Sequence, residues 1–489
     1  AMAELARLCG RLPLALAVAG ARLRVQPQWS ASRLVERLRA EEGRLAELEA
    51  DDRAVRASFG VGYRAVADDP DGEQAARMFR LLGLHPGTDF SAAVAAALIE
   101  TTSERAEHML GRLVDVQLVE AHQTGRYRLH DLLRLYARER AFDEEAEPQR
   151  AQAIRRITDS YVATARNALH AHRQGGPMLR ERLEPRELAS PGVEIKSKEE
   201  AYAWLVVELD NLLAAIRESV KTSACDSGIA LATTIAPMLR DLGHWHQQLI
   251  VGEIVVPVAQ DRDDARALFF VRHDLASVQR WLGRLDDALR NCEQNVDLCR
   301  RHGLRTMESV ALNLLGEIHR LLKNFDAAVE HLRASLVVLH EHGEGVDESI
   351  AYMRLGLVCQ QTERFDEALD AHRRALRIAQ DTGDEWNEAS ALGNVGATLQ
   401  QADRPDEAVS HFEQALSRTE QARLGDTALA AEQHWGYGDA LYDLSRRGSA
   451  RDRWNKAASI LHRIGLITAE QKAAIAASSR PTMPSVLEW

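Results

Sequence analysis

The sequence is poor in aromatic residues and cysteine, and it has no long apolar run. Phe, Trp and Tyr make up 5% of the 489 residues, whereas hydrophobic residues of all kinds make up 45%. Because Ala, Leu, Arg and Glu dominate, this composition favours helices over sheets. No apolar stretch reaches the roughly 18 residues that a membrane span requires, and the sequence shows no signal peptide. We therefore expect a soluble, mainly α-helical protein of the cytoplasm with no membrane contact.

Cysteine is too scarce and too scattered for a disulfide framework. The five cysteines are odd in number, and only Cys292 and Cys299 lie near each other, with no partner at metal-ligand spacing. We interpret all five as buried free thiols of a reducing compartment, in preference to redox or metal-binding residues.

The chain also lacks a net positive charge. Its 73 acidic residues outnumber its 61 Lys and Arg residues, so the formal net charge is −12 and the pI is about 5.9. This balance argues against broad nucleic-acid binding but allows a local basic patch.

The second half of the chain carries an internal repeat of 40 residues. Four blocks share the pattern Asp-x-Ala followed by Leu or Val, and they lie at 283–289, 323–329, 363–369 and 403–409. Twelve places before each alanine stands a small residue, namely Ala276, Gly316, Gly356 and Gly396. A small residue in one helix lets the next helix approach closely, so this spacing predicts stacked helix pairs. An earlier unit near 242–245 and a later one slipped by two residues extend the predicted array to 225–475.

This pattern resembles the tetratricopeptide repeat, lengthened here from about 34 to 40 residues. Such repeats stack into a superhelix, and the first helix of each pair lines its concave face. A peptide or protein partner is therefore expected on that face, although no repeated Lys/Asn pair identifies its chemistry. The alternative is that these positions are ordinary solvated helix surface. The candidate groove residues are His273, Arg280, Asn313, Glu317, Arg320, Met353, Gln360, Gln361, Gln400 and Gln401.

The first half divides into a helical domain at 1–64 and a small domain at 65–141. In the first, Pro13 interrupts a helical pattern and should occupy the first turn of a helix, and a second helix is expected at about 31–49. In the second, three helical segments precede two alternating stretches around Gly125, which predicts a winged helix with a β-hairpin wing. The helix that would read DNA is close to neutral, although Arg126 and Arg128 make the wing basic. We therefore favour an internal structural role over DNA reading.

His130 and Asp131 stand where the wing gives way to an amphipathic helix. Asp131 is expected to cap a helix that begins at Leu132, since its carboxylate can accept the free N–H groups of the first turn. His130 would then be the last residue of the strand.

Two short motifs carry a family resemblance. Residues 10–16, Gly-Arg-Leu-Pro-Leu-Ala-Leu, resemble the GLPLAL motif of NB-ARC-type STAND ATPases, and 129–131, Leu-His-Asp, resemble their MHD motif. Together with stretches such as "FRLLGLHPGTDF" and "YRLHDLLRLYARERA", they resemble the large Streptomyces antibiotic regulatory protein (SARP) activators. This resemblance implies that Pro13 lines the adenine side of bound ADP and that His130 contacts its β-phosphate. It also implies that Asp131 caps the following helix and holds the junction.

The sequence departs from that family in lacking the nucleotide-binding core. It has no G-x-x-x-x-G-K-[ST] loop and no strand ending in paired acidic residues before Leu12. The chain is therefore expected to begin partway through the NB-ARC region and to be no enzyme, since phosphoryl transfer depends on those groups. No cofactor is expected in this chain alone, whereas ADP or ATP with magnesium is expected in the full-length parent.

A helical linker region is expected at 142–224, with an exposed Pro/Gly loop near 174–198. A flexible tail is expected at 476–489.

The preferred hypothesis is that the chain is the regulatory half of a SARP-type transcriptional activator of secondary metabolism. Its repeats would bind a protein, peptide or effector, and the winged helix would couple this event to nucleotide state and self-association. DNA would be bound only by domains upstream of residue 1. The alternative is a stand-alone repeat scaffold or peptide receptor.

Overall fold

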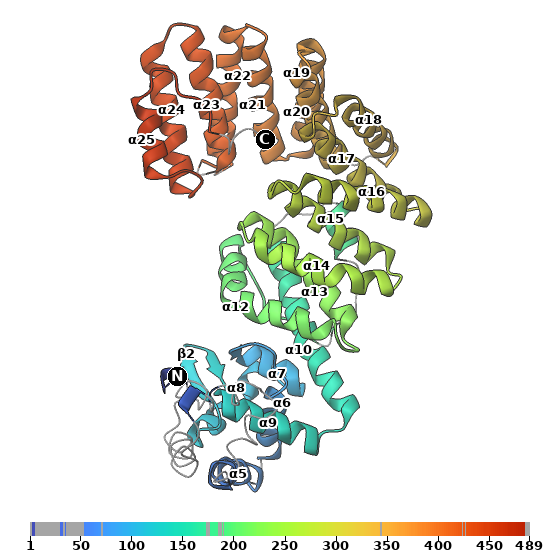
Figure 1. Ribbon diagram of the computed structural model, residues 1–489, viewed down its shortest axis with the longest axis vertical. Coiled ribbons are helices and arrows are strands. Elements are labelled where there is room, and N and C mark those ends of the chain that lie inside the picture. The colour runs from blue at the N-terminus through green and yellow to red at the C-terminus, as the bar shows by residue number, and fades with distance from the viewer. Residues whose placement is uncertain are drawn as a thin grey trace. The chain divides into compact units, whose positions relative to one another are not determined.

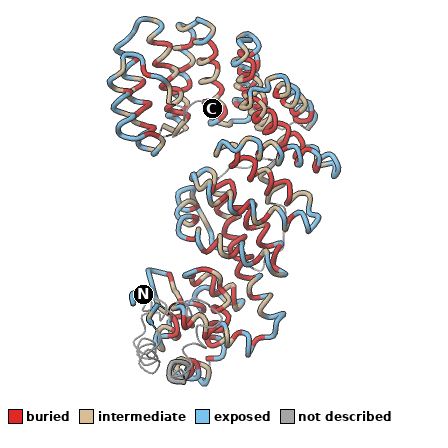
Figure 2. The backbone as a smooth tube through the Cα atoms, in the orientation of Figure 1, coloured by how far each residue is buried: buried red, intermediate tan, exposed pale blue. Residues whose placement is uncertain are grey.

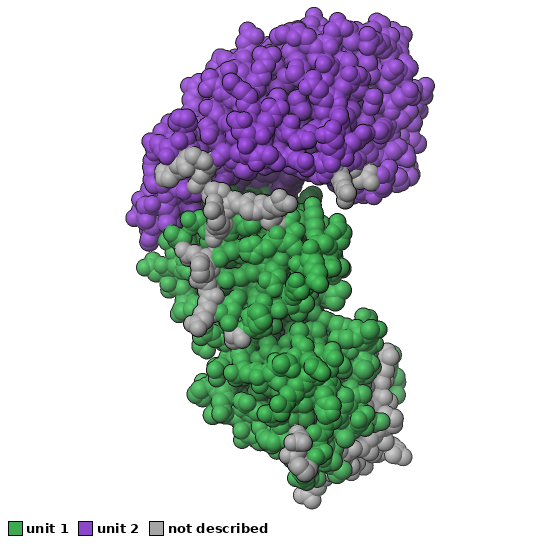
Figure 3. All heavy atoms as spheres, turned by 180° about the vertical axis from the view of Figure 1, so that it is seen from behind, with its two compact units in different colours: residues 1–175, 179–278 green, residues 176–178, 279–489 purple. Residues whose placement is uncertain are grey.

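The chain forms two compact units in the computed structural model (Figures 1 and 3). One contains 1–175 and 179–278, the other 176–178 and 279–489. The structure describes residues 2–4, 30–32, 35, 53–69, 72–172, 177–183, 188, 190–342, 345–422, 424–425 and 427–484. Pro13, the 10–16 motif and nearly all of the helix predicted at 31–49 lie outside these residues.

A winged helix occupies the beginning of the first unit, as the sequence predicts. After α5 (Arg53–Ala67) come the three helices α6 (Glu73–Leu82), α7 (Ala92–Ile99) and α8 (Ser103–Asp115). The antiparallel sheet has the order β1-β3-β2, formed by β1 (Phe90–Ser91), β2 (Glu120–Gln123) and β3 (Arg126–Arg128). The side chains of Ser91 and Thr102 accept hydrogen bonds from the first turns of α7 and α8, which fixes where these helices begin. The third strand, β1, was not predicted.

Four helices follow along the chain: α9 (Asp131–Glu144), α10 (Glu147–His172), α11 (Pro177–Arg182) and α12 (Lys198–Ser219). The long helix α10 packs against α7, α12 and α13 and so forms the centre of the unit. Part of the loop predicted as an exposed joint is docked on it. The Asn167 side chain donates to the backbone oxygen of Val193 at 2.8 Å, and the Val193 N–H donates to Thr164 Oγ1 at 3.0 Å. Pro191 and Val193 are exposed, as predicted, while side chains of α10 satisfy backbone groups of this loop.

Helix pairs follow at the predicted 40-residue interval. The first helices of five successive pairs begin at 225, 265, 305, 345 and 385, and the second helices at 245, 285, 325, 365 and 405. They are α13 (Cys225–Asp241), α14 (Trp245–Asp261), α15 (Ala265–Trp281), α16 (Leu285–His302), α17 (Arg305–Leu321), α18 (Phe325–His342), α19 (Gly345–Gln361), α20 (Phe365–Thr382), α21 (Glu385–Gln401) and α22 (Pro405–Gln421). The array ends with α23 (Ala428–Asp443), α24 (Arg447–Arg463) and α25 (Ala469–Ala477). In the second unit each helix from α16 to α25 packs on the next (Figure 1).

The glycines of the repeat do what the sequence predicts, since each receives a side chain from the second helix of its pair. A Cβ added at Gly316 would lie 2.6 Å from Leu332 Cγ, and one at Gly438 would lie 2.5 Å from Trp454 Nε1. In the pairs between them, Gly356 meets His372 and Gly396 meets Phe412. Figure 2 shows buried residues along the facing sides of these helices. Close approach of the helices therefore requires a residue without a large side chain at these positions.

The segment after α25 packs back on α23. Arg480 forms an ion pair with Asp443 at 3.2 Å and lies 4.7 Å from the centre of the Tyr442 ring. Pro481 is buried, and Met483 packs against the core that includes Trp454. The prediction of a flexible tail at 476–489 is therefore wrong for the described residues through 484.

Candidate functional site

The junction between wing and helix contains His130, one of the residues singled out by the resemblance. Helix α9 begins at Asp131, one residue earlier than predicted, and His130 is the N-cap residue with extended backbone angles. The expectation that Asp131 caps this helix is therefore wrong, because Asp131 already has helical geometry. Its carboxylate lies in the first turn, where the helix dipole favours negative charge.

His130 is held by an acidic residue of the wing. Its Nε2 lies 2.9 Å from Glu120 Oε2, and both Glu120 oxygens also accept hydrogen bonds from Arg128, at 2.8 and 3.0 Å. Arg128, and with it His130, holds the pKa of Glu120 below its ordinary value. The His130 side chain is 33% exposed, so solvent reaches it. Pro13 lies outside the described residues, so a joint site of Pro13 and His130 stays a prediction.

The other basic residue of the wing, Arg126, is buried in an ion-pair network that sequence analysis missed. Its guanidinium donates to Asp89 Oδ1 at 2.6 Å and forms an ion pair with Glu208 of α12. The Asn211 side chain bridges these two carboxylates, with hydrogen bonds of 3.0 Å to Asp89 and 2.7 Å to Glu208. Arg126 therefore joins the wing to α12, which supports an internal role for the winged helix.

The same network reaches α10 through two aromatic side chains. The Tyr161 hydroxyl donates to Glu208 at 3.5 Å and lies 3.2 Å from His85 Nε2. Burial lowers the pKa of His85 to about 3, so this histidine stays neutral at ordinary pH. One signal in the sequence could have indicated the network. Glu208 and Asn211 lie three residues apart on one face of α12, in a stretch (203–216) whose one other charged residue is Asp210, and a buried polar pair needs partners.

Several predicted groove residues form a buried polar layer in the second unit. Arg320 donates two hydrogen bonds to Glu317, at 2.9 and 3.0 Å, and Arg280 lies 3.8 Å from the same carboxylate. Arg354, one repeat later, donates to Asn313 Oδ1 at 2.8 Å. Burial would raise the pKa of Glu317, but the Arg320 guanidinium holds it below its ordinary value. Glu317, Arg320 and Asn313 are therefore buried, the first two bonded to each other and Asn313 bonded to Arg354, so they do not form an exposed groove surface.

The remaining candidates differ in exposure. His273 stacks on Phe269 with ring centres 5.6 Å apart, and Met353 is buried beside Ala375 and Ala391. Gln400 is half-buried and donates to Asp443 Oδ2 at 2.8 Å. Of the other three, Gln360 is half-buried, whereas Gln361 and Gln401 are exposed.

A second site, which could not be predicted from the sequence, is formed by α13 and α15 and binds the side chain of Arg182 from α11. Its guanidinium donates to both Asp274 oxygens, at 2.6 and 2.9 Å, and to the backbone oxygen of Thr233 at 2.7 Å. The guanidinium carbon lies 4.5 Å from the centre of the Phe270 ring. Thr233 precedes the predicted groove residue His273 by one repeat of 40 residues. We call Asp274, the Thr233 carbonyl and Phe270 the arginine site.

The described residues show neither a metal centre nor a membrane span. Nowhere among them do three His, Cys, Asp or Glu side chains gather as metal ligands would. Cys225, Cys292, Cys299 and Cys359 are buried free thiols, and burial raises the pKa of Cys299 to about 12, so its reactive thiolate form is suppressed. Within the same described ranges, no helix combines the length and apolar character needed to cross a bilayer.

The comparisons with known proteins identify the repeats and a regulatory relative. The tetratricopeptide repeat family model matches residues 267–338, 347–421 and 387–463. The regulatory protein AfsR of Streptomyces coelicolor is 36% identical over 284 residues, which is 57% of this chain and 28% of that protein. The AfsR of Streptomyces griseus is 36% identical over 293 residues, 60% of this chain and 29% of that protein. This chain thus spans less than a third of the curated relatives that it matches.

A solved structure covers most of the chain at low similarity. It is a Signal Transduction ATPase with Numerous Domains protein with a tetratricopeptide repeat sensor, from Pyrococcus horikoshii. The identity is 13% and the TM-score is 0.40, with 94% of this chain and 74% of that chain covered.

Proposed function

We propose that this tetratricopeptide-repeat chain, a homologue of the AfsR regulatory proteins, is the sensor part of a STAND-type transcriptional activator of secondary metabolism. The observation that carries the proposal is the 36% identity to two AfsR proteins over more than half of the chain. The chain acts by binding and not by catalysis. Promoter DNA is bound by other domains of the full-length protein, and the complex works in the cytoplasm.

The repeats bind a protein or peptide partner on their inner face. Tetratricopeptide arrays present an extended surface that suits such ligands. A surface of the first repeats already binds a side chain within the chain, because the arginine site holds Arg182 from a segment outside the repeats.

The winged helix couples partner binding to the nucleotide state and self-association of the full-length protein. His130 would contact ADP, since its side chain is partly exposed and its Nε2 is held by the Glu120 carboxylate, which a phosphate could replace as its partner. Asp131 would orient the junction from the first turn of α9. In a longer protein that includes the nucleotide-binding core, His130→Ala should speed release of fluorescent ADP about tenfold, the effect of losing about 1.4 kcal/mol of binding.

The test of the regulatory function is transcript profiling in the host of this sequence. Removal of the coding segment for 265–463, with the reading frame kept, should change the levels of a restricted set of transcripts. Restoring the segment should return them to the original levels. Transcript levels that are the same with and without the repeats would contradict the proposal.

A further inference from the structure

The arginine site has the features of a receptor for a guanidinium group. A carboxylate that accepts two parallel hydrogen bonds matches the planar fork of arginine, and an aromatic ring face adds a cation–π contact. Lysine cannot reproduce this geometry, because its ammonium group is a compact point charge. Only 9% of the Arg182 side chain and 5% of the Asp274 side chain are exposed, so the pair is shielded from water. The site therefore selects arginine over lysine.

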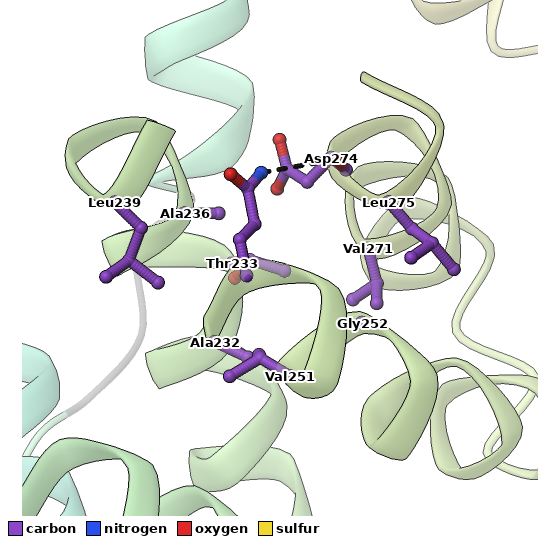
Figure 4. Close-up of a pocket in the computed structure, with 10 residues that line it drawn as sticks. Ala232, Thr233, Ala236, Leu239, Val251, Gly252, Val271, Asp274 and Leu275 are labelled. Atoms are coloured by element: carbon purple, nitrogen blue, oxygen red, sulfur yellow. Dashed lines mark hydrogen bonds between the residues drawn. The ribbon is translucent and has the colours of Figure 1, made fainter. Parts of the chain in front are cut away.

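A small cavity next to this site holds an unsatisfied acceptor (Figure 4). The cavity of about 10 Å³ is lined by α13, α14 and α15 and shares Thr233 and Asp274 with the arginine site. Gln248 is buried there, and its Nε2 donates to the backbone oxygen of Asp274 at 3.2 Å. Its Oε1 is buried and has no hydrogen-bond partner in the described structure. Helix α11 thus leaves one buried acceptor unused, at a cost in free energy.

The segment that fills the arginine site is short. Helix α11 has six residues, and besides the contacts of Arg182 it forms an ion pair between Glu181 and Arg266, both more than a third exposed. Exposed ion pairs contribute little to stability. Among the described side chains of α11, Arg182 therefore makes the strongest attachment, and a competitor that also satisfied Gln248 would have an advantage.

We propose that the inner face of α13 and α15 binds an arginine-bearing peptide segment of a partner protein, which displaces α11. This inference rests on the proposed role of the repeats in partner binding and specifies the chemistry of that partner. In the sequence, α11 lies between the winged helix and the repeats. Release of α11 therefore frees the segment that joins the repeats to the winged helix, and through this segment a bound partner acts on the upstream domains.

The experiment uses the whole chain and a fluorescein-labelled heptapeptide with the sequence of 177–183, Pro-Met-Leu-Arg-Glu-Arg-Leu. Fluorescence anisotropy should show that the Arg182→Ala chain, with its site vacated, binds the probe at least tenfold more tightly than the unmodified chain. Adding Asp274→Asn should weaken this binding at least tenfold. A probe with lysine at its second arginine should also bind at least tenfold more weakly. The matched control is Asp226→Asn, which removes the charge of an exposed arginine-paired aspartate on α13, the helix that supplies Thr233 to the site, and should change nothing.

Equal affinity of the probe for Arg182→Ala chains with and without Asp274→Asn would overturn the proposal. Should Arg182→Ala prevent folding, hydrogen exchange of the Asp274→Asn chain decides instead. Amides of 179–183 should exchange at least tenfold faster than in the Asp226→Asn chain, and equal rates would overturn the proposal. Failure here, together with a changed transcript profile on removal of 265–463, would refute the arginine chemistry while leaving the regulatory function standing.

Discussion

At the scale of single residues, His372 is the most unusual part of the repeat core. It occupies the position that Leu332 and Phe412 fill in the neighbouring repeats, packed against Gly356. The side chain is fully buried, and neither ring nitrogen has a hydrogen-bond partner among the described residues. Burial lowers its pKa to about 3. A histidine here is therefore tolerated only in its neutral form.

This burial predicts a loss of stability in acid. The unfolded chain binds a proton at His372 below about pH 6.5, whereas the folded chain excludes it until about pH 3, so stability falls between these values. When the pH is lowered from 8 to 5, the free energy of unfolding should fall by about 2 kcal/mol less in the His372→Leu chain than in the unmodified chain. Urea unfolding at both pH values measures this. His302→Leu, at an exposed position, should leave the loss unchanged, and the same result for His372→Leu would refute the argument.

Residue positions could be predicted from the sequence better than residue environments. The 40-residue period placed Asn313, Glu317 and Arg320 correctly on the first helix of their pair, because a period fixes position along a helix. It could not show that they are buried, since their polarity is satisfied by partners such as Arg354, 41 residues after Asn313. The one-residue error at Asp131 has a similar cause, because the backbone angles of His130 determine where α9 begins.

At the scale of elements, the close approach of paired helices depends on the glycines of the repeat. Gly316→Ala should lower the free energy of unfolding by about 1–3 kcal/mol, because the new methyl group would overlap Leu332 Cγ. Urea denaturation gives this value. Gly111→Ala is the matched control, since Gly111 lies in α8 with nothing within 4 Å of an added Cβ. It should stabilise by about 0.5–1 kcal/mol, and a similar gain at Gly316 would contradict this account of packing.

The attachment of the wing to α12 depends on the buried Arg126–Glu208 pair. Glu208→Gln should destabilise the first unit by about 3 kcal/mol, because it leaves a buried guanidinium with half of its compensating charge. The control Glu120→Gln removes a partly exposed partner of Arg128, which should cost under about 1 kcal/mol. Hydrogen exchange of the α12 amides separates the two outcomes. Equal effects would mean that the buried pair does not anchor α12.

Which elements exist could be read from the sequence, but long-range contacts could not. The three helices and the hairpin of the winged helix were predicted from periodicity and turn residues. Strand β1 was missed because two residues, Phe90 and Ser91, give no alternation to detect. The docking of α11 was missed because Arg182 and Asp274 lie 92 residues apart, and no periodicity links them.

At the scale of the whole molecule, the chain combines a winged helix with a tetratricopeptide array, and α11 lies between them in the sequence. Regulation by such a chain needs an event in the repeats that alters the upstream segment. The arginine site supplies one, because a partner that takes the place of Arg182 releases α11.

The most direct test of this account is to change the arginine site in the natural gene and measure transcripts of the regulated set. Asp274→Asn removes the charge that holds α11, so we predict levels at least severalfold different from those of the unmodified strain. Asp226→Asn, which removes the charge of an exposed arginine-paired aspartate on α13, should leave the levels unchanged. Unaltered transcript levels in the Asp274→Asn strain, with the protein present in normal amount, would contradict the claim that this face of the repeats controls transcription.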